Sequence, residues 1–460
     1  MTAAADILMH PASFRDPAGF VFLLDGRLYR QVNPCYAGSY DRLMQSGLYD
    51  ALTRDGLLIP HSEEQALTAR YPDAYRILQP RPVDRLSYAA EWSPAQLRDA
   101  ALLTLRLQSL AMDHGMSLKD AIPNNVQFID GKPVFLDTLS FGRYDPSEPW
   151  IAYRQFCENF LFPLYIHFYA RTGTHPFAAA WPEGVPAATA GRLLPWRSRW
   201  NAGAWLHVHL QARIGGRQSG GGQHRHNFSA AKLLRLVEHL RTLTERLAMP
   251  AAGDSAWSRY YDETVPGEDY IRDKERIFRR FLDRTGSGVA LDLGCNDGWF
   301  ARILAEHGRP VIAVDADWQC VDRLYRKGIS AILPLCVDLA NPTPACGFRN
   351  AERAAFTDRM RSDLVVALAL VHHLALGRNI PLPLIADGFQ QLTRRHLIVE
   401  FVPATDRKAM QLAARKDPAL LEGYDSGNFE AAFGRYFRLD ERETVAGTER
   451  VLYLMTKRQP

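Results

Sequence analysis

In the second half of the chain, short apolar runs alternate with segments long enough to form helices. Each run is seven residues long and rich in Val, Leu, Ile and Ala. Short, continuous apolar runs between helical segments are typical of parallel strands that helices cover on both faces of a sheet. The pattern therefore predicts an α/β unit, which two later segments, 436–439 and 450–455, close as a hairpin. The five runs are VALDLGC (289–295), PVIAVDA (310–316), AILPLCV (331–337), LVVALAL (364–370) and HLIVEFV (396–402).

The chain is too long for one small domain. It has 460 residues, and at about 150 residues per domain this length predicts roughly two to three domains. Hydrophobic residues make up 47% and charged residues 23%, which excludes a chain that stays unfolded. Lys and Arg number 55 and Asp and Glu number 51, an excess too small to predict nucleic acid or an anionic membrane as a partner from composition.

The cysteines and the N-terminus bear on the location of the protein. Six cysteines are present, without the CxxC or Cys/His spacing of a zinc site, and they are too sparse for a disulfide scaffold. The N-terminal sequence MTAAADILMHPASFRDPAGF lacks the basic and apolar regions of a signal peptide. No apolar run reaches the length of about 18 residues that a membrane span needs. We therefore expect an unexported, cytoplasmic protein with no membrane span.

A change in composition predicts the main domain boundary near residue 250. Segment 214–226, IGGRQSGGGQHRH, is rich in glycine and polar residues and is expected to be a surface loop. Segment 250–255, PAAGDS, has the small and polar residues of a linker. We therefore predict an N-terminal domain over 1–250 and a C-terminal domain over 251–460, which begins with a helix at 257–281.

The first apolar run ends in a glycine-containing turn, DLGCNDG at 292–298, that leads directly into a helix. Glycine allows the backbone to approach a ligand closely, and the N-terminus of a helix offers free N–H groups. The second run reaches Asp315, 23 residues after Asp292, where a carboxylate can accept hydrogen bonds from both hydroxyls of a ribose. The third run is followed by Asp338. Because the carboxyl ends of parallel strands meet at one edge of a sheet, these three carboxylates are expected to converge on one crevice.

This arrangement resembles the class I S-adenosylmethionine-dependent methyltransferases, whose pattern is D-x-G-x-x-x-G followed by acidic ends of the second and third strands. The resemblance covers residues 283–457 and implies a Rossmann-like sheet of seven strands and S-adenosylmethionine as the cofactor. Asn296 departs from the pattern, because the family usually has glycine there, but asparagine also tolerates left-handed backbone angles. A NAD-binding Rossmann domain is the alternative, and LDLGCNDG lacks its GxGxxG pattern.

The resemblance implies a role for each residue near the cofactor. Asp292 would hold the amino group of the methionine part, directly or through water, Asp315 the ribose and Asp338 the adenine amino group. The loop from Gly294 to Gly298 would pass beneath the methionine part. The implied cofactor-binding residues are Asp292, Gly294, Cys295, Asn296, Gly298, Asp315, Asp338 and Ala369.

Two histidines follow the fourth run, in the sequence LALVHHLAL. His372 and His373 would lie near the transferred methyl group, where a histidine, whose unperturbed pKa is about 6.5, can remove a proton from a hydroxyl or amine nucleophile. The alternative is that the pair serves packing and helix capping. Glu400, in the fifth run, is a second catalytic candidate that would orient a substrate or a histidine. Its alternative is a carboxylate solvated at a strand end.

Longer stretches of the C-terminal part are similar to a bacterial group of class I methyltransferases related to host-specific nodulation proteins. This similarity indicates lineage and leaves the methyl acceptor open among a small molecule, a glycan or lipid-linked saccharide, and a protein. The stretches are FRNAERAAF, ALALVHHLALGRNIPL, IVEFVP and RVLYLM.

The N-terminal half begins with the pattern of a hairpin and continues with a second motif. GFVFLLDGRLYRQV predicts two strands joined at Asp25-Gly26, and DRLMQSGLYDALTRDG after it predicts a helix. Further on, SLKDAIPNNVQFIDGKPVFLDTLSFG has Asp120, Asn125 five residues later, and Asp137 at the end of a second short hairpin. This order resembles protein-kinase-like and aminoglycoside-phosphotransferase-like folds. The resemblance implies an α+β domain in which Asp120 is the base and Asn125 and Asp137 bind Mg²⁺ with ATP.

The kinase-like pattern is incomplete. No glycine-rich phosphate loop precedes the first strands, and the strand that should carry a phosphate-binding lysine offers only Arg27 or Arg30. Three hypotheses follow. In the first, the protein is a methyltransferase whose kinase-like half recognises the substrate. In the second, it is a bifunctional kinase and methyltransferase with Mg-ATP in the N-terminal half. In the third, the N-terminal half is a pseudokinase that presents or regulates the substrate.

Overall fold

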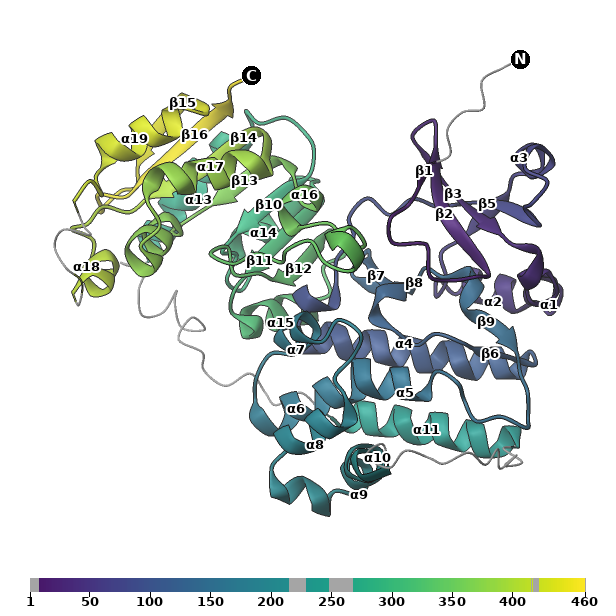
Figure 1. Cartoon of the computed structure of the whole chain (residues 1–460). Coiled ribbons are helices and arrows are strands. Elements are labelled where there is room, and N and C mark those ends of the chain that lie inside the picture. Colours follow the sequence, from purple (N-terminus) through teal and green to yellow (C-terminus); the bar gives the residue numbers. More distant parts are fainter. Residues whose placement is uncertain (1–7, 215–228, 248–267, 415, 417–421, 460) are drawn as a thin grey trace. The chain divides into compact units, whose positions relative to one another are not determined.

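The structure is a computed structural model of the chain that describes residues 8–214, 229–247, 268–414, 416 and 422–459 (Figure 1). It divides into two compact units, which we call unit 1 and unit 2. Unit 1 comprises residues 1–250 together with the distant segment 345–354, and unit 2 comprises 251–344 and 355–460. Most of the glycine-rich segment, the linker at 250–255 and the first part of the helix expected at 257–281 lie outside the described residues.

Unit 1 begins with an antiparallel sheet of five strands in the order β1-β2-β3-β5-β4. The predicted hairpin is confirmed, because Leu24 pairs with Arg27 and both turn residues, Asp25 and Gly26, have positive φ. The helix expected after it is broken into two at Gly47, whose φ of 79° is incompatible with a continuous helix. These elements are β1 (Leu8–Met9), β2 (Gly19–Leu24), β3 (Arg27–Val32), α1 (Ala37–Gln45), α2 (Leu48–Arg54), β4 (His61–Glu63), α3 (Gln65–Arg70) and β5 (Arg76–Pro80).

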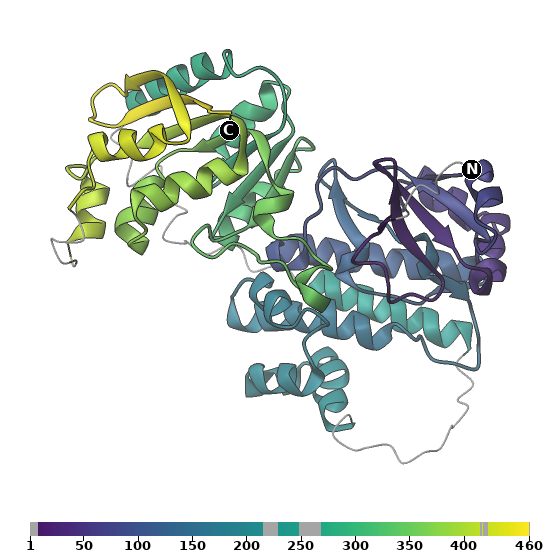
Figure 2. The same ribbon diagram turned by 45° about the horizontal axis from the view of Figure 1, so that its top comes forward.

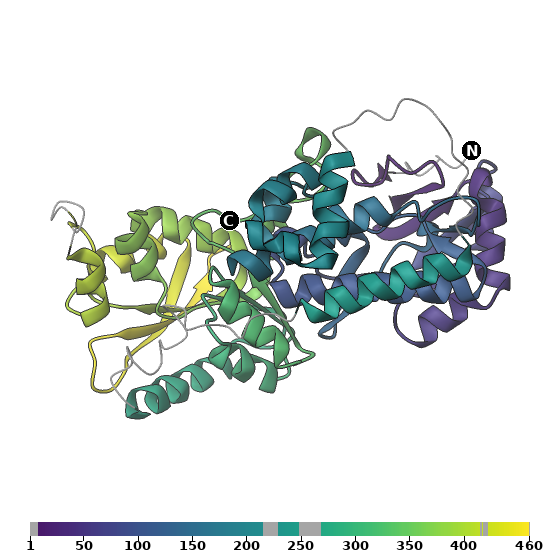
Figure 3. The ribbon, with the colours of Figure 1, turned by 90° about the horizontal axis from the view of Figure 1, so that it is seen from below.

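The rest of unit 1 is largely helical, with two short hairpins. Helix α4 starts at a capping box in which Ser93 and Gln96 exchange hydrogen bonds, and its buried side packs against α11 (Figure 3). Strand β6 pairs with β9, and β7 pairs with β8. The elements are α4 (Pro94–Asp113), β6 (Met116–Leu118), β7 (Val126–Ile129), β8 (Lys132–Phe135), β9 (Phe141–Arg143), α5 (Tyr153–Phe156), η5 (Cys157–Leu161), α6 (Phe162–Ala170), α7 (His175–Ala180), α8 (Ala187–Leu193), η6 (Trp196–Trp200), α9 (Ala202–Ala204), η7 (Trp205–His209), α10 (Leu210–Ile214) and α11 (Ala230–Arg246).

Unit 2 contains a seven-stranded sheet in the order β12-β11-β10-β13-β14-β16-β15. The five apolar runs form five parallel strands, and the predicted closing hairpin adds β16 and β15, with β16 antiparallel to β14. All four residues of the central strand β10 are buried, as the continuous apolar pattern predicts. The strands are β10 (Ala290–Leu293), β11 (Val311–Asp315), β12 (Ile332–Cys336), β13 (Ser362–Ala367), β14 (Thr393–Phe401), β15 (Phe437–Thr444) and β16 (Val451–Lys457).

Helices cover this sheet and complete its core. In Figure 3, α13 lies on one face of the sheet and α17 on the other. Phe278 and Phe281 of α13 are fully buried in the core beside Ile303 and Leu304 of α14. No helix in the described part of the chain has the length and apolar character to cross a bilayer. The helices are α13 (Glu268–Leu282), α14 (Trp299–Glu306), α15 (Trp318–Arg326), α16 (Phe356–Arg359), η9 (His373–Gly377), α17 (Leu382–Leu392), α18 (Arg407–Ala413) and α19 (Ser426–Gly434).

Candidate cofactor-binding and active site

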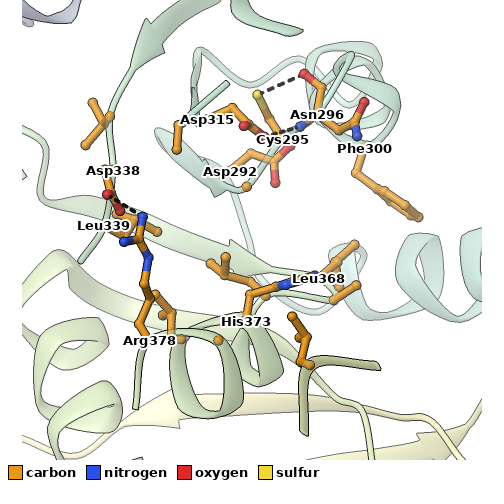
Figure 4. Close-up of a pocket in the computed structure, with 18 of the residues that line it drawn as sticks. Asp292, Cys295, Asn296, Phe300, Asp315, Asp338, Leu339, Leu368, His373 and Arg378 are labelled. Atoms are coloured by element: carbon orange, nitrogen blue, oxygen red, sulfur yellow. Dashed lines mark hydrogen bonds and ion pairs between the residues drawn. The ribbon is translucent and has the colours of Figure 1, made fainter. Parts of the chain in front are cut away.

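A cavity of about 350 Å³ opens at the carboxyl ends of the parallel strands of unit 2 (Figure 4). This is the edge of the sheet at which the acidic strand ends were expected to converge. The cavity is lined by Tyr270, Ile271, Lys274, Asp292, Gly294, Cys295, Asn296, Phe300, Asp315, Ala316, Val337, Asp338, Leu339, Leu368, Ala369, Leu370, His373, Leu374, Gly377, Arg378 and Leu412.

The loop after β10 turns sharply into α14. Gly294, Asn296 and Gly298 all have left-handed backbone angles, with φ of 73°, 51° and 84°. A side chain at Gly294 would come within 3.3 Å of the side chain of Leu370, which also lines the cavity. The turn therefore forms with asparagine at its middle position, and glycine at Gly294 keeps the cavity wall open.

Asp292 has an unsatisfied carboxylate at the wall of the cavity. The residue is only 3% exposed, and its Oδ2 has no hydrogen-bond partner among the described residues. Burial, and next the charge of Asp315, raise the pKa of Asp292 to about 7. A buried acceptor without a hydrogen-bond partner destabilises the protein. A ligand with a positively charged donor would supply that partner.

Asp315 ends β11 next to Asp292 (Figure 4) and is held by backbone donors. The N–H of Asn296 donates to Oδ2 and the N–H of Asp317 donates to Oδ1, each over 2.8 Å. Burial raises the pKa of Asp315 to about 6, although these amides stabilise its charge. Each carboxylate oxygen has two lone pairs, so both oxygens can still accept a hydroxyl.

Asp338 follows β12 and is bridged to a residue that sequence reasoning did not select. Its Oδ2 accepts a hydrogen bond from Arg378 over 3.0 Å (Figure 4). Its Oδ1 accepts one from the N–H of Ala340. Arg378 comes from the segment after His373, where no sequence pattern distinguished it from a solvated arginine. The pair presents a charged, hydrogen-bonding rim on the β12 side of the cavity.

A buried polar cluster adjoins the cavity. Lys274 Nζ donates to Glu400 Oε2 over 2.6 Å, and Tyr270 donates to Glu400 Oε1 over 2.9 Å. Arg450 donates to the Tyr270 hydroxyl over 2.9 Å and forms an ion pair with Asp406. Only Lys274 and Tyr270 of this cluster line the cavity.

Glu400 is fully buried, so the alternative of a solvated strand-end carboxylate is wrong. Although burial acts to raise its pKa, the charges of Lys274 and Arg450 hold the pKa of Glu400 below its ordinary value. Glu400 does not line the cavity and contacts it through Lys274. Sequence reasoning missed Lys274 and Tyr270 because their helix precedes the recognisable motif.

Of the two histidines, His373 lines the cavity and His372 does not. Their ring centroids lie 4.1 Å apart. His372 is fully buried, and neither ring nitrogen has a hydrogen-bond partner among the described residues. Burial lowers the pKa of His373 to about 4 and holds that of His372 well below its ordinary value, so both imidazoles are neutral near pH 7.

In unit 1, two of the three residues of the kinase-like pattern, Asn125 and Asp137, contact Ser140. Asn125 Nδ2 lies 3.3 Å from Ser140 Oγ, which donates to Asp137. Asp137 also forms an ion pair with Arg30 of β3. Asp120 Oδ1 accepts a hydrogen bond from Gln155. Burial acts to raise the pKa of Asp137. The charge of Arg30 and the hydrogen bond from Ser140 outweigh this effect and hold the pKa of Asp137 below its ordinary value. Within the described residues, no group of three His, Cys, Asp or Glu side chains could hold a metal ion.

Comparison with known proteins identifies the family. No family model matches the chain. Nodulation protein NoeA of Rhizobium meliloti (strain 1021) is 30% identical over 459 residues, covering 96% of this chain and 94% of the relative. The chain belongs to the NoeA family. Because the match covers nearly the whole chain, the likeness within the NoeA family extends across both units.

Two solved structures that are similar to this NoeA-family chain are methyltransferases. The N-methyltransferase NodS of Bradyrhizobium japonicum WM9 shares 14% identity and covers 42% of this chain and 100% of its own, with a TM-score of 0.32. Magnesium protoporphyrin IX methyltransferase ChlM of Synechocystis PCC 6803, with bound SAH, shares 15% identity and covers 44% and 92%, with a TM-score of 0.32. The seven-stranded sheet of unit 2 and the acidic strand ends at its cavity agree with the fold that the resemblance to class I S-adenosylmethionine-dependent methyltransferases implied.

Proposed function

We propose that this NoeA-family protein transfers a methyl group from S-adenosylmethionine to an acceptor held at the cavity of unit 2. The observation that carries the proposal is the buried, unpartnered Oδ2 of Asp292, which lies beside Asp315 in a cavity of about 350 Å³. The volume lies within the range typical of small-molecule sites. The relative is named a nodulation protein, which supports a role for the proposed activity in nodulation.

The residues around the cavity fit the parts of the cofactor. Asp292 and Lys274 present opposite charges in one region of the wall, which suits an amino acid that carries both an ammonium and a carboxylate group. The Gly294 turn lies at the same cavity wall. Asp315 would accept the ribose hydroxyls, and Asp338 with Arg378 would hold the adenine. S-adenosylmethionine, when bound, supplies a methyl group on a positively charged sulfur that is already activated for displacement.

The protein then has to align the acceptor and exclude water. His373 is the candidate for contact with the acceptor, because it is the histidine that lines the cavity. With its pKa lowered to about 4 by burial, its neutral ring accepts a hydrogen bond from a hydroxyl or amine and is a weak base. Its contribution is therefore mainly orientation of the nucleophile. His372 packs against the His373 ring, and Glu400 acts as a positioning residue through Lys274.

Calorimetric binding of S-adenosylhomocysteine to the purified full chain tests the cofactor site. Asp292→Asn should weaken binding about tenfold or more, because a charge-assisted hydrogen bond contributes roughly 1.5–3 kcal/mol. Asp297→Asn is the matched control, since Asp297 belongs to the same loop but does not line the cavity. The proposal fails if the wild type does not bind the ligand, or if both variants bind as tightly as the wild type.

For unit 1, we propose a kinase-like fold that recognises the methyl acceptor. Its support is the five-stranded antiparallel sheet followed by a largely helical part. Asn125 and Asp137 meet at Ser140, and the charge of Asp137 acts on Asp120. A bifunctional kinase and methyltransferase is the alternative. The Arg30–Asp137 ion pair argues against it, because it neutralises the carboxylate that would have to bind Mg²⁺. The acceptor class remains a small molecule, a glycan or a protein.

We also propose that the protein acts in the cytoplasm. All six cysteines are free thiols in the structure, and four of them are buried. Free thiols, rather than disulfides, are typical of proteins in reducing compartments. Fractionation of cells that express the full chain would test this location.

A further inference from the structure

One part of unit 1 concentrates positive charge. Between Glu183 and Glu238 the sequence contains no Asp or Glu, although the chain as a whole is nearly balanced in charge. The basic residues in this stretch are Arg192, Arg197, Arg199, Arg213, Arg217, Arg225, Lys232 and Arg235. Such a stretch repels cations and attracts anionic partners whatever the net charge of the protein.

The same stretch exposes large apolar side chains, which we call the tryptophan patch: Leu193, Trp196, Trp200, Trp205 and Leu206. Trp196 is 72% exposed and Trp200 is 81% exposed, and no tryptophan outside the patch is comparably exposed in the described part of the chain. Tryptophan is usually well buried in soluble proteins because it contributes a large apolar area. Exposed apolar side chains gathered in this way mark an interaction surface.

The patch is carried by a built scaffold of short helices, α8, η6, α9 and η7 (Figure 2). Ser198 Oγ lies 2.8 Å from His209 Nε2, which ties η6 to η7, and Asn201 caps the N–H of Ala204 over 3.0 Å. Ser198, Ala204 and Val208 are fully buried. The inward positions are therefore packed, and the tryptophans occupy the outward positions.

The arginines beside the patch have no carboxylate partners. Arg192, Arg197 and Arg199 are exposed, and none of them forms an ion pair with an acidic side chain among the described residues. Arg197 instead lies over the ring of Tyr169, 5.7 Å from its centroid, and donates to the Tyr169 carbonyl over 3.4 Å, which leaves its charge without a counter-ion in the described part of the chain. Three cations are thus available to an external anion.

We propose that the tryptophan patch docks the protein on an anionic phospholipid surface. Tryptophan rings favour the boundary between headgroups and acyl chains, Leu193 and Leu206 add apolar area there, and arginines bind the headgroup phosphates. A neutral glycan would leave the arginines without a partner, and a nucleic acid would leave the two leucines exposed. The contact is peripheral and independent of the proposed methyl transfer.

Sedimentation of the full-length protein with vesicles tests the docking. The protein should bind vesicles of phosphatidylcholine that contain about 30% phosphatidylglycerol, which gives a strongly anionic surface. It should not bind vesicles of phosphatidylcholine alone. Trp196→Ala combined with Trp200→Ala should weaken binding at least about tenfold. Arg199→Gln should weaken it about fivefold, since one basic residue contributes about 1 kcal/mol near such a surface. Leu384→Ala, which removes a side chain that is 62% exposed in unit 2, should leave binding unchanged.

Several outcomes would overturn the proposal. Equal binding to neutral and anionic vesicles, or no binding to either, would contradict it. The proposal would also be contradicted if the double tryptophan variant, with an unchanged circular dichroism spectrum, bound anionic vesicles as tightly as the wild type. If the patch instead mediates self-association, analytical ultracentrifugation would show a dimer that the double variant loses, without vesicle binding. RNA binding that is lost in the double variant, again without vesicle binding, would point to nucleic acid as the partner.

Discussion

Asn296 donates its backbone N–H to Asp315 Oδ2 over 2.8 Å. This bond joins the loop after β10 to the end of β11, the two neighbouring strands whose acidic ends lie side by side in the cavity. It is made by the main chain, so it does not depend on the side chain at position 296. An asparagine with φ of 51° therefore supports the same turn that a glycine would.

Gly294→Val should abolish binding of S-adenosylhomocysteine. The added side chain would point toward Leu370 at the cavity wall, at a φ of 73° that valine adopts only under strain. Gly308→Val is a matched control, because Gly308 has a φ of 74° with open space around it. Both variants should lose a similar amount of thermal stability, about 1–2 kcal/mol, and only the first should lose calorimetric binding. Retained binding in Gly294→Val would contradict the role of this loop.

Cofactor affinity should rise with pH. The pKa of Asp292 is raised to about 7, chiefly by burial, and only the ionised carboxylate attracts the ammonium group of the ligand. Between pH 5.5 and pH 8, affinity for S-adenosylhomocysteine should increase about tenfold, with an upper limit of about thirtyfold, and then level off. Calorimetry across this range would measure the effect. The increase should be absent in Asp292→Asn, and a pH-independent affinity in the wild type would exclude Asp292 as the titrating contact.

Asp292→Asn should also stabilise the ligand-free protein at high pH. Because the pKa of Asp292 is raised on folding, ionised Asp292 costs stability, and this cost grows as the pH rises from 3.8 to about 7. A neutral side chain removes it, for a gain of up to about 4 kcal/mol at pH 8 that shrinks toward pH 4. Melting temperatures of both proteins at pH 5 and pH 8 would test this. If Asp292→Asn were less stable than the wild type at pH 8, the prediction would be wrong and ionised Asp292 would stabilise the fold.

Glu400→Gln should destabilise the protein by about 3–5 kcal/mol, because it leaves Lys274 buried without a counter-charge. Replacing the pair together, as Lys274→Met with Glu400→Leu, should recover most of this loss, since apolar residues of similar volume tolerate burial. Chemical denaturation measures both changes. If Lys274 also binds the cofactor, the double variant should be stable and still bind S-adenosylhomocysteine weakly. Full binding by the double variant would restrict the pair to a structural role.

Mg-ATP should not stabilise the wild-type protein. Arg30 occupies the carboxylate of Asp137, so Mg²⁺ would have to displace a partly buried ion pair to bind there. A ligand that binds only the folded state at 100 times its dissociation constant adds about 2.7 kcal/mol of stability, which a thermal-shift titration detects readily. A clear shift in the wild type that disappears in Asp137→Asn would favour the bifunctional enzyme over the recognition role.

Much of unit 2 could be predicted from the sequence. The five apolar runs, the glycine turn at 292–298 and the hairpin at Asp25-Gly26 in unit 1 are encoded in short windows, where side-chain periodicity and turn residues act on adjacent backbone. The convergence of Asp292, Asp315 and Asp338 also followed from sequence, because parallel strands end at a common edge.

Other features depend on partners far along the chain, and only the tertiary structure decided them. Glu400 became a buried ion pair because folding brings Lys274, 126 residues away, against it. Arg30 reached Asp137 because β3 and the segment after β8 meet in space. Which of two adjacent histidines lines the cavity is set where the chain enters the π-helical turn after β13, at His372 and His373. The sequence determines which side chains can carry a charge. The tertiary structure determines how far each charge is removed from water and which counter-charge lies beside it, because packing places distant residues around it.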